Sequence, residues 1–311
     1  MKVAALALIL MAAGLAASAG NSTSAADCSK TSMPFTPLID LGTGKYHGYQ
    51  GGLYPGGKNA PSKAYLKKGL AYAKLVKPRD ASGKAASDGK VVLLSVGMSN
   101  TTQEFSEFLR ESAAVKKDSH LVIVDGAQGG QDAEIVKDPE ANFWRVLDGR
   151  LTAAGVTGAQ VQTVWLKEAI SRPTETFPAD AKRLQADLHA IVTLMGSRFP
   201  NLRLVYVSSR TYGGYATTPL NPEPYAYQSG FAVKWLVQER IQGRLEGRPW
   251  VGWGPYLWTN GAKGRSDGLT WTCADVRPAD GTHPSPSGQQ KVAQLLLRFF
   301  TTNSTAKPWF S

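Results

Sequence analysis

A short apolar run followed by a glycine most strongly constrains how this chain can fold. Five of the six residues from 91 to 96 are valine or leucine, a pattern typical of a strand covered on both faces in a parallel sheet. Gly97 permits a tight departure from that strand, and Phe105 and Phe108 follow at helical spacing. The pattern predicts a buried strand, a turn and a helix, with Ser99 at the turn.

Two interpretations of this turn stay open. Residues 101–104 have the S/T-x-x-E form of a capping box, and backbone N–H groups and the positive end of the helix dipole gather at a helix start. That environment suits an oxyanion that develops beside Ser99. Serine and asparagine are also the ordinary residues of helix starts, so the alternative is that Ser99 and Asn100 only form the turn and the cap.

Beyond this turn, strand and helix patterns alternate along the chain. Strands are predicted at 121–125, 161–166 and 202–207, and helices at 61–76, 142–154, 179–195, 229–245 and 285–300. Such alternation predicts an α/β fold in three layers, with a doubly wound, mostly parallel sheet covered on both sides. Ligands of these sheets lie beyond the carboxyl ends of the strands, and Ser99, Gly129 and the loop 210–212 would lie at that edge.

The N-terminus has the features of a secretory signal peptide. Lys2 precedes an apolar run at 3–17, and Ala17-Ser18-Ala19 forms a small-residue cleavage signal. We therefore expect a secreted or periplasmic protein without stable membrane insertion, because no later segment reaches ~20 apolar residues. The predicted organisation is a signal peptide at 1–19, a leader with a glycine-rich loop and a helix at 20–89, and the main domain at 90–311.

The cysteines and the net charge indicate which covalent bond, metal site and binding partners to expect. An exported chain with two cysteines, Cys28 and Cys273, favours a disulfide, and two unpaired thiols are the alternative. Their spacing does not suggest a metal site. The formal charge of +11 favours acidic polymers or anionic surfaces as neighbours. The basic residues are scattered without an aromatic-basic motif, so no nucleic-acid partner is expected.

One histidine has the setting of a catalytic base. His283 lies in a loop before the last predicted helix, and Asp280 stands three residues before it. This spacing lets a carboxylate hold one ring nitrogen while the other faces a serine. Asp280 as a turn residue and His283 as a helix-start residue are the alternative. The other histidines lie in the glycine-rich leader, before a strand and inside a helix, at His47, His120 and His189.

The order of these features resembles the SGNH (GDSL-like) hydrolase superfamily. Gly97-Met98-Ser99-Asn100 and Asp280-Gly281-Thr282-His283-Pro284 are most similar to its carbohydrate-acetylesterase branches, and the resemblance spans residues 90–300. It implies a flavodoxin-like fold and an esterase that needs neither metal nor cofactor. It also implies Ser99 as nucleophile, His283 as general base and Asp280 as its orienter. The N–H groups of Ser99 and Gly129 would be oxyanion donors. Gly130 could equally be the glycine that supplies the second N–H group.

One block departs from the superfamily pattern. An Asn in a Gly-x-Asn-Asp context normally follows the third strand, whereas this chain has Trp165-Leu166-Lys167-Glu168-Ala169. Lys167 could supply a charged oxyanion donor, Asn100 could approach from beside the serine, or the site could be altered or inactive. Lys167 and Glu168 as a charged strand end are the further alternative.

Aromatic and polar residues near this edge are the candidates for substrate contact. Trp and Tyr faces stack well on sugar rings, although most large aromatic side chains serve packing. The predicted substrate-binding residues are Gln128, Arg210, Tyr212, Trp253 and Tyr256. Together these features predict a secreted serine esterase that deacylates a small-molecule or polysaccharide ester, and the resemblance implies that this ester is a carbohydrate. An inactive carbohydrate-binding relative and a lipid or aryl esterase are the alternatives, and the oligomeric state is left open.

Overall fold

A five-stranded parallel sheet forms the centre of the computed structural model, which describes residues 25–244 and 249–311. Its order is β4-β3-β5-β6-β7, so the chain starts in the interior of the sheet and reverses direction at β3, as in flavodoxin-like folds. The strands are β3 (Val91–Gly97), β4 (Leu121–Asp125), β5 (Val161–Lys167), β6 (Leu204–Val207) and β7 (Trp250–Trp253). The predicted α/β fold is confirmed.

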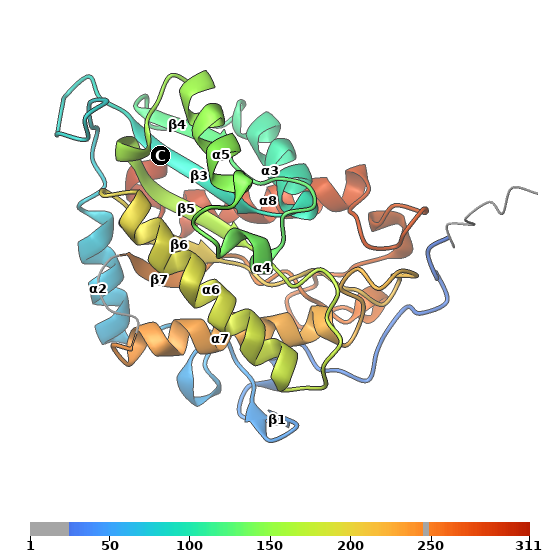
Figure 1. Cartoon of the computed structure of the whole chain (residues 1–311). Helices are drawn as coiled ribbons and strands as arrows, with labels where there is room; N and C mark the ends of the chain where they lie inside the picture. Colours follow the sequence, from blue (N-terminus) through green and yellow to red (C-terminus); the bar gives the residue numbers. More distant parts are fainter. Residues whose placement is uncertain (1–24, 245–248) are drawn as a thin grey trace, which may run out of the picture.

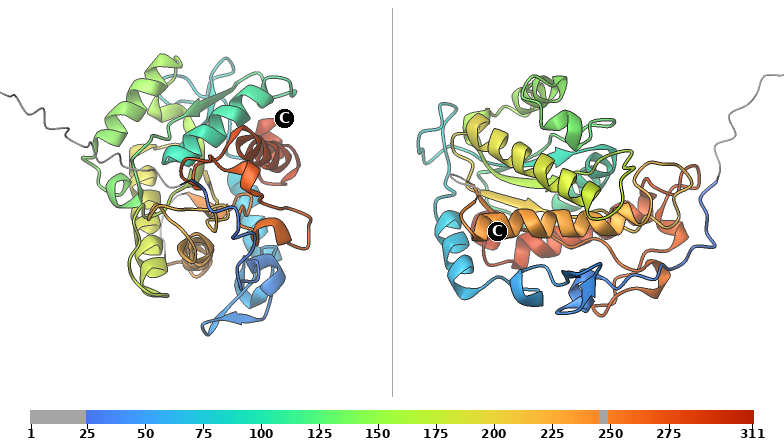
Figure 2. Two further views of the ribbon diagram at one scale, coloured as in Figure 1. Left: turned by 90° about the vertical axis from the view of Figure 1, so that its right-hand side faces the viewer. Right: turned by 60° about the horizontal axis from the view of Figure 1, so that its bottom comes forward.

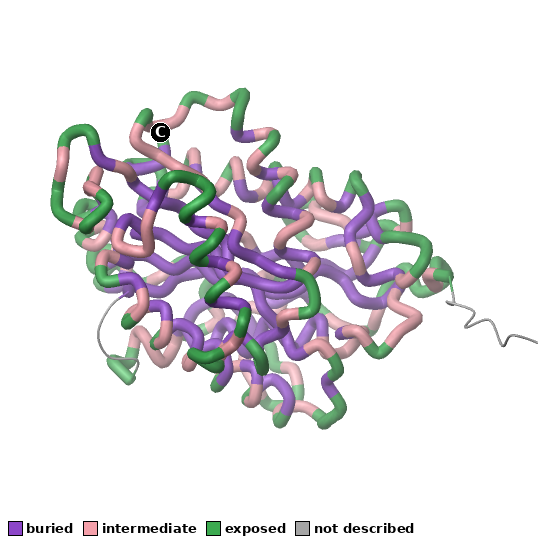
Figure 3. Tube along the Cα trace, turned by 45° about the horizontal axis from the view of Figure 1, so that its top comes forward, coloured by how far each residue is buried: buried purple, intermediate pink, exposed green. Residues whose placement is uncertain are grey.

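Helices cover both faces of the sheet (Figures 1 and 2). On one face lie α3 (Ser99–Ser112) and α8 (Pro286–Thr302), which pack on each other; on the other lie α5 (Asn142–Ala153), α6 (Ala179–Arg198) and α7 (Tyr225–Ile241). Every residue of β3 and β5 is buried, and the burial tube of Figure 3 shows the sheet as the continuous buried centre. None of the helices in the described ranges is both long and apolar enough to cross a membrane.

The segment before residue 90 packs on the same core. The remaining strands and α-helices of the described residues are α1 (Leu38–Leu41), the hairpin β1 (Lys45–Tyr46) and β2 (Tyr49–Gln50), α2 (Lys63–Ala73), α4 (Ala133–Val136) and α9 (Lys307–Phe310). The hydroxyl of Tyr65 on α2 donates to the Val251 carbonyl oxygen of β7 at 2.6 Å. Leu38, on α1, is fully buried. Side chains on both sides of residue 90 thus share one hydrophobic core.

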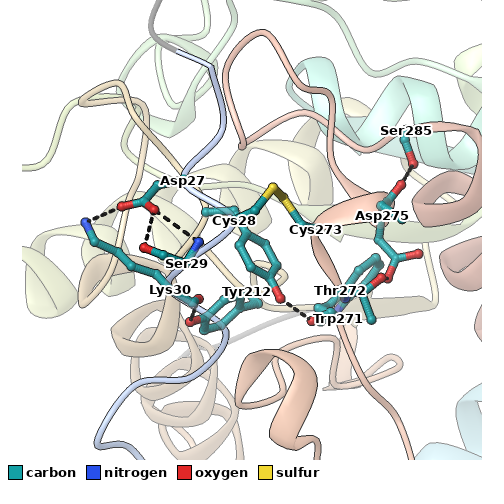
Figure 4. Close-up of a disulfide and its surroundings, with 12 residues drawn as sticks. Asp27, Cys28, Ser29, Lys30, Tyr212, Trp271, Thr272, Cys273, Asp275 and Ser285 are labelled. Atoms are coloured by element: carbon teal, nitrogen blue, oxygen red, sulfur yellow. Dashed lines mark hydrogen bonds and ion pairs between the residues drawn. A yellow bond between two sulfur atoms is a disulfide. The ribbon is translucent and has the colours of Figure 1, made fainter.

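A disulfide joins the two cysteines (Figure 4). Cys28 and Cys273 have Cα atoms 5.4 Å apart although 245 positions separate them in sequence. Beside the bridge, the Tyr212 hydroxyl donates to the Lys30 carbonyl oxygen at 2.7 Å. The bridge therefore fixes the N-terminal segment against the loop that leads to Asp280, and the predicted signal peptide at 1–19 lies outside the described residues.

Three local expectations need correction. Strand β7 is not among the predicted strands: its four residues are tryptophan, valine and glycine, and Trp253 was expected to contact substrate. Helix α7 begins at Tyr225 and not at 229. The capping box at 101–104 does not form: α3 already starts at Ser99, with Met98 as its N-cap residue.

Candidate active site

The carboxyl edge of the sheet brings together the three residues predicted to carry the chemistry. Ser99 Oγ lies 2.9 Å from His283 Nε2, and His283 Nδ1 lies 2.7 Å from Asp280 Oδ2. Ser99 and His283 are 184 positions apart in sequence. The hydrogen-bonded order hydroxyl, imidazole, carboxylate is the geometry of a serine nucleophile with its base and orienter.

Asp280 shapes its own turn as well as the imidazole. Its Oδ1 accepts the backbone N–H groups of Thr282 and His283, each at 2.8 Å, while Oδ2 faces the ring. Burial by itself would raise the pKa of the Asp280 carboxyl, but these two N–H groups and the imidazole hold it below its ordinary value. An ionised Asp280 favours a proton on Nδ1, which leaves Nε2 free to accept the serine proton.

A glycine is required inside this turn. Gly281 has φ +62°, and a Cβ there would lie 1.9 Å from the Tyr215 carbonyl oxygen. Because a side chain at this position would collide with backbone, only glycine lets the loop approach so closely. The Thr217 N–H donates to the Asp280 carbonyl oxygen at 3.3 Å and joins the same two loops.

The strand-to-helix turn places Ser99 at the first residue of α3. A Cβ at Gly97 would lie 2.4 Å from the Lys167 carbonyl oxygen, and the Thr101 hydroxyl donates to that same oxygen at 2.7 Å. This close approach holds the turn against the end of β5. The first N–H groups of a helix lack intrahelical partners and carry the positive end of its dipole. Ser99 therefore lies beside backbone N–H groups that are suited to an oxyanion.

Gly129 lies next to Ser99 on the neighbouring loop. A Cβ built on Gly129 would lie 3.9 Å from Ser99 Cβ, whereas one built on Gly130 would meet nothing within 4 Å. The loop is held by the Gln128 N–H, which donates to the Gly97 carbonyl oxygen at 2.9 Å. Of the two registers left open by the sequence, this proximity favours Gly129.

The Lys167 ammonium is committed to a carboxylate inside the core. Its Nζ lies 2.6 Å from Glu104 Oε1 and 2.5 Å from Oε2, and both side chains are 0% exposed. Burial lowers the pKa of Lys167 to about 8, against the pull of the Glu104 carboxylate. The alternative that Lys167 is only a charged strand end in contact with solvent is therefore wrong. As an oxyanion donor, Lys167 would have to leave Glu104 as an unpaired buried charge, so we assign it to the core.

Asn100 also faces another partner. Its Nδ2 donates to the Thr282 carbonyl oxygen at 2.9 Å, and the side chain is fully buried. Asn100 thus ties the start of α3 to the turn that carries His283. This contact supports the relative placement of the two loops and does not require an oxyanion contact.

Four of the predicted substrate contacts are buried packing residues. Their polar groups bond to backbone: Gln128 Nε2 to the Phe143 carbonyl oxygen at 2.8 Å, the Tyr212 hydroxyl to that of Lys30, Trp253 Nε1 to that of Leu53, and the Tyr256 hydroxyl to the Leu38 N–H. All four are at most 8% exposed. Large aromatic side chains with one polar group are well suited to this anchoring role, and the expected cleft contacts are corrected accordingly.

Sequence reasoning missed Glu223, which belongs to a buried ionisable cluster with Arg210 and Glu168. Arg210, the fifth predicted substrate contact, is buried like the other four. Arg210 is 3% exposed, and its Nε and Nη1 have no hydrogen-bond partner among the described residues. Burial raises the pKa of Glu168 well above its ordinary value and that of Glu223 to about 7. Glu223 was not singled out because its partners, Gly213, Tyr227 and Trp258, come from three separate segments. No group of His, Cys, Asp and Glu side chains in the described residues is arranged to hold a metal ion.

The fold and this site define a flavodoxin-like α/β protein with a Ser-His-Asp arrangement at the carboxyl edge of its sheet. No family model matches the chain, and no curated protein matches it.

Several solved structures are remotely similar to this chain. A Bacteroides fragilis protein described as a candidate acylhydrolase is 12% identical, with 77% of this chain and 97% of that chain covered and a TM-score of 0.40. The periplasmic domain of a lipopolysaccharide acetyltransferase from Salmonella ser. Paratyphi A is 11% identical, with 76% and 94% covered and a TM-score of 0.39. A Streptococcus pneumonia protein described as a candidate platelet activating factor is 14% identical, with 76% and 92% covered and a TM-score of 0.40.

Proposed function

We propose that this protein is an exported serine esterase that removes an acyl group from a carbohydrate. The observation that carries the proposal is the hydrogen-bonded series from Ser99 through His283 to Asp280, with Gly129 beside the serine. Export is supported by the signal-like residues 1–19 and by the disulfide. The carbohydrate rests on the sequence resemblance described above.

The geometry supports a two-step acyl transfer. Ser99 Oγ attacks the ester carbonyl carbon while His283 Nε2 takes its proton, and the N–H groups of Ser99 and Gly129 face the resulting oxyanion. His283 then gives the proton to the departing alkoxide, which leaves an acyl group on Ser99. Water, deprotonated by His283, attacks this acyl group, and the proton returns to Ser99 as the carboxylic acid leaves.

The unusual end of β5 defines a second candidate function. The chain lacks the Asn of the resembled pattern, and Lys167 in that block is paired with Glu104 in the core. Two backbone donors and the α3 dipole would then serve the oxyanion without a third side chain. If they do not suffice, the protein is a carbohydrate-binding relative without turnover.

A paired screen distinguishes the two. Purified protein is assayed on 4-nitrophenyl acetate and on acetylated polysaccharides, with Ser99→Ala as the matched control. We expect acid release by the wild type alone. Glycan binding by both proteins without acid release from any ester would establish the binding protein instead, and equal turnover by both would move the chemistry away from Ser99.

A further inference from the structure

Four loops meet around Ser99 and His283, and we call them the site loops: 126–132, 168–178, 208–224 and 276–285. Hydrogen bonds join them to one another. The Ser171 N–H donates to Asp132 Oδ2 at 2.9 Å, and the Ser171 carbonyl oxygen accepts the Asn221 N–H at 3.1 Å. The Thr217–Asp280 bond described above links the third loop to the fourth. The site loops therefore form one connected rim.

Every acidic side chain of the site loops is buried or already engaged. Asp132 caps α4 and accepts the Ser171 N–H, Glu168 is 2% exposed, and Asp280 holds His283. The remaining two also have partners, Arg183 for Glu175 at 3.9 Å and three N–H groups for Glu223. Among the five carboxylates of the site loops, Glu175 alone stays 53% exposed, in its long contact with Arg183, and the other four are buried or held by closer partners.

The basic side chains of the site loops show the opposite pattern. They are three arginines, and none has an ion pair or a side-chain hydrogen bond to another described residue: Arg172, Arg210 and Arg277. Arg172 and Arg277 are exposed, whereas Arg210 is buried near the carboxyl groups of Glu104 and Glu168. The free charge of the rim is thus positive and is carried by Arg172 and Arg277.

Hydrogen bonds connect the loops of these two arginines to the His283 turn and to the Gly129 loop. The Arg277 N–H donates to the His283 carbonyl oxygen at 2.7 Å, and the Arg277 carbonyl oxygen accepts the Gly281 N–H at 2.9 Å, so Arg277 opens the catalytic turn. Arg172 follows Ser171, which is bonded to Asp132 on the Gly129 loop. Arg277 therefore belongs to the turn that carries His283, and Arg172 belongs to a loop that is bonded to the Gly129 loop.

We propose that Arg172 and Arg277 bind carboxylates of an acidic glycan and so select an acylated polyuronate as substrate, an inference that rests on the proposed esterase function. Guanidinium groups bind carboxylates through two parallel hydrogen bonds, and exposed, unpaired ones keep this capacity. The formal charge of +11 adds long-range attraction for a polyanion. A neutral glycan would offer both guanidinium groups only uncharged hydrogen-bond acceptors.

The test compares acetylated polygalacturonate with acetylated xylan as substrates. The proteins are wild type, the double variant Arg172→Gln/Arg277→Gln, and Arg298→Gln, an exposed arginine on α8 outside the site loops. We expect wild type to have a lower KM for the polygalacturonate. The double variant should raise that KM at least about tenfold, the equivalent of about 1.4 kcal/mol, and raise the KM for xylan much less. Arg298→Gln should behave as wild type on both.

A second measurement is independent of turnover. Ser99→Ala protein, with and without the double substitution, is titrated with unacetylated oligogalacturonate at two salt concentrations. Salt-sensitive binding that is lost with the two arginines supports the inference even if the esterase proposal fails. Equal KM values for both glycans together with unchanged oligogalacturonate binding by the double variant would overturn it, as would arginine-dependent capture by anionic phospholipid vesicles without binding of oligogalacturonate. Esterase activity on 4-nitrophenyl acetate would leave the proposed function standing in either case.

Discussion

At the scale of single residues, the Ser99, His283 and Asp280 geometry makes an unequal prediction for its three members. Ser99→Ala or His283→Gln should lower kcat on 4-nitrophenyl acetate by at least about 10,000-fold, because the nucleophile or its base is lost. Asp280→Asn should be milder or comparable, since the carboxylate orients and does not attack. Steady-state kinetics measure the loss, and circular dichroism should show that Ser99→Ala remains folded. A Ser99→Ala protein with wild-type turnover would contradict the assignment.

Gly129 gives a second prediction, about the room beside the nucleophile. Its φ is not in the left-handed region, and an added Cβ would lie at ordinary contact distance from Ser99 Cβ, 3.9 Å away. Gly129→Ala should therefore fold normally but crowd the acyl group. We expect kcat/KM to fall more for 4-nitrophenyl butyrate than for the acetate.

Gly149 supplies the matched control for that substitution. It lies on α5, and an added Cβ there meets nothing within 4 Å. Gly149→Ala should leave the butyrate-to-acetate ratio unchanged. If Gly129→Ala and wild type had the same butyrate-to-acetate ratio of kcat/KM, the acyl group would not lie against Gly129.

At the scale of elements, the buried Lys167–Glu104 pair joins β5 to α3. Removing one partner leaves an unpaired charge in the core. Lys167→Ala should therefore lower the free energy of unfolding by about 3–5 kcal/mol. The double variant Lys167→Met/Glu104→Leu should recover much of this loss, because it removes both charges and keeps volume. Urea denaturation measures each value.

An exposed ion pair on the same helix provides a control for the cost of breaking the buried pair. Arg110 and Glu107 form an i,i+3 pair on α3, and the Arg110 side chain is 66% exposed. Arg110→Ala should cost at most about 1 kcal/mol. If Lys167→Ala were equally mild, the buried pair would not be the link between strand and helix that its contacts indicate.

The loop between β6 and α7 contains a carboxyl whose titration should make the free energy of unfolding depend on pH. Burial raises the pKa of Glu223 to about 7 from an ordinary value of 4.5. Between these values the native protein holds a proton that the unfolded chain has released, so the contribution is full below pH 4.5 and lost as pH rises through 7. The stability of wild type relative to Glu223→Gln should fall by at least about 1 kcal/mol from pH 4.5 to pH 8.

Denaturation at the two pH values tests this sign. The exposed Glu140 offers a control, because Glu140→Gln makes the same chemical change outside the core. A wild-type advantage over Glu223→Gln that grows with pH would mean that the carboxyl ionises more readily in the folded protein than in the unfolded chain.

At the scale of the whole molecule, the features that can be predicted from the sequence are those that a local residue pattern determines. The apolar run of β3 and the glycine after it are sufficient for strand, turn and helix, and the Asp-x-x-His spacing is sufficient for the contact between Asp280 and His283. Glu104 shows the limit: its local context indicates a cap, but its partner Lys167 lies 63 positions away. Strand β7 is similar, since it becomes a strand through pairing with β6. The aromatic residues offered no local signal that would separate a buried ring from a cleft wall.

The disulfide acts at this largest scale, because it closes a loop of almost the entire described chain. A bridge between positions 245 residues apart restricts the unfolded chain far more than the folded one. We expect Cys28→Ser/Cys273→Ser to lose about 2–5 kcal/mol of unfolding free energy, measured by urea denaturation under oxidising conditions. Wild type with a reductant should unfold at the same midpoint as the variant. The same midpoint for oxidised wild type and the variant would show that the bridge contributes no stability, and that packing alone holds the N-terminal segment near the catalytic turn.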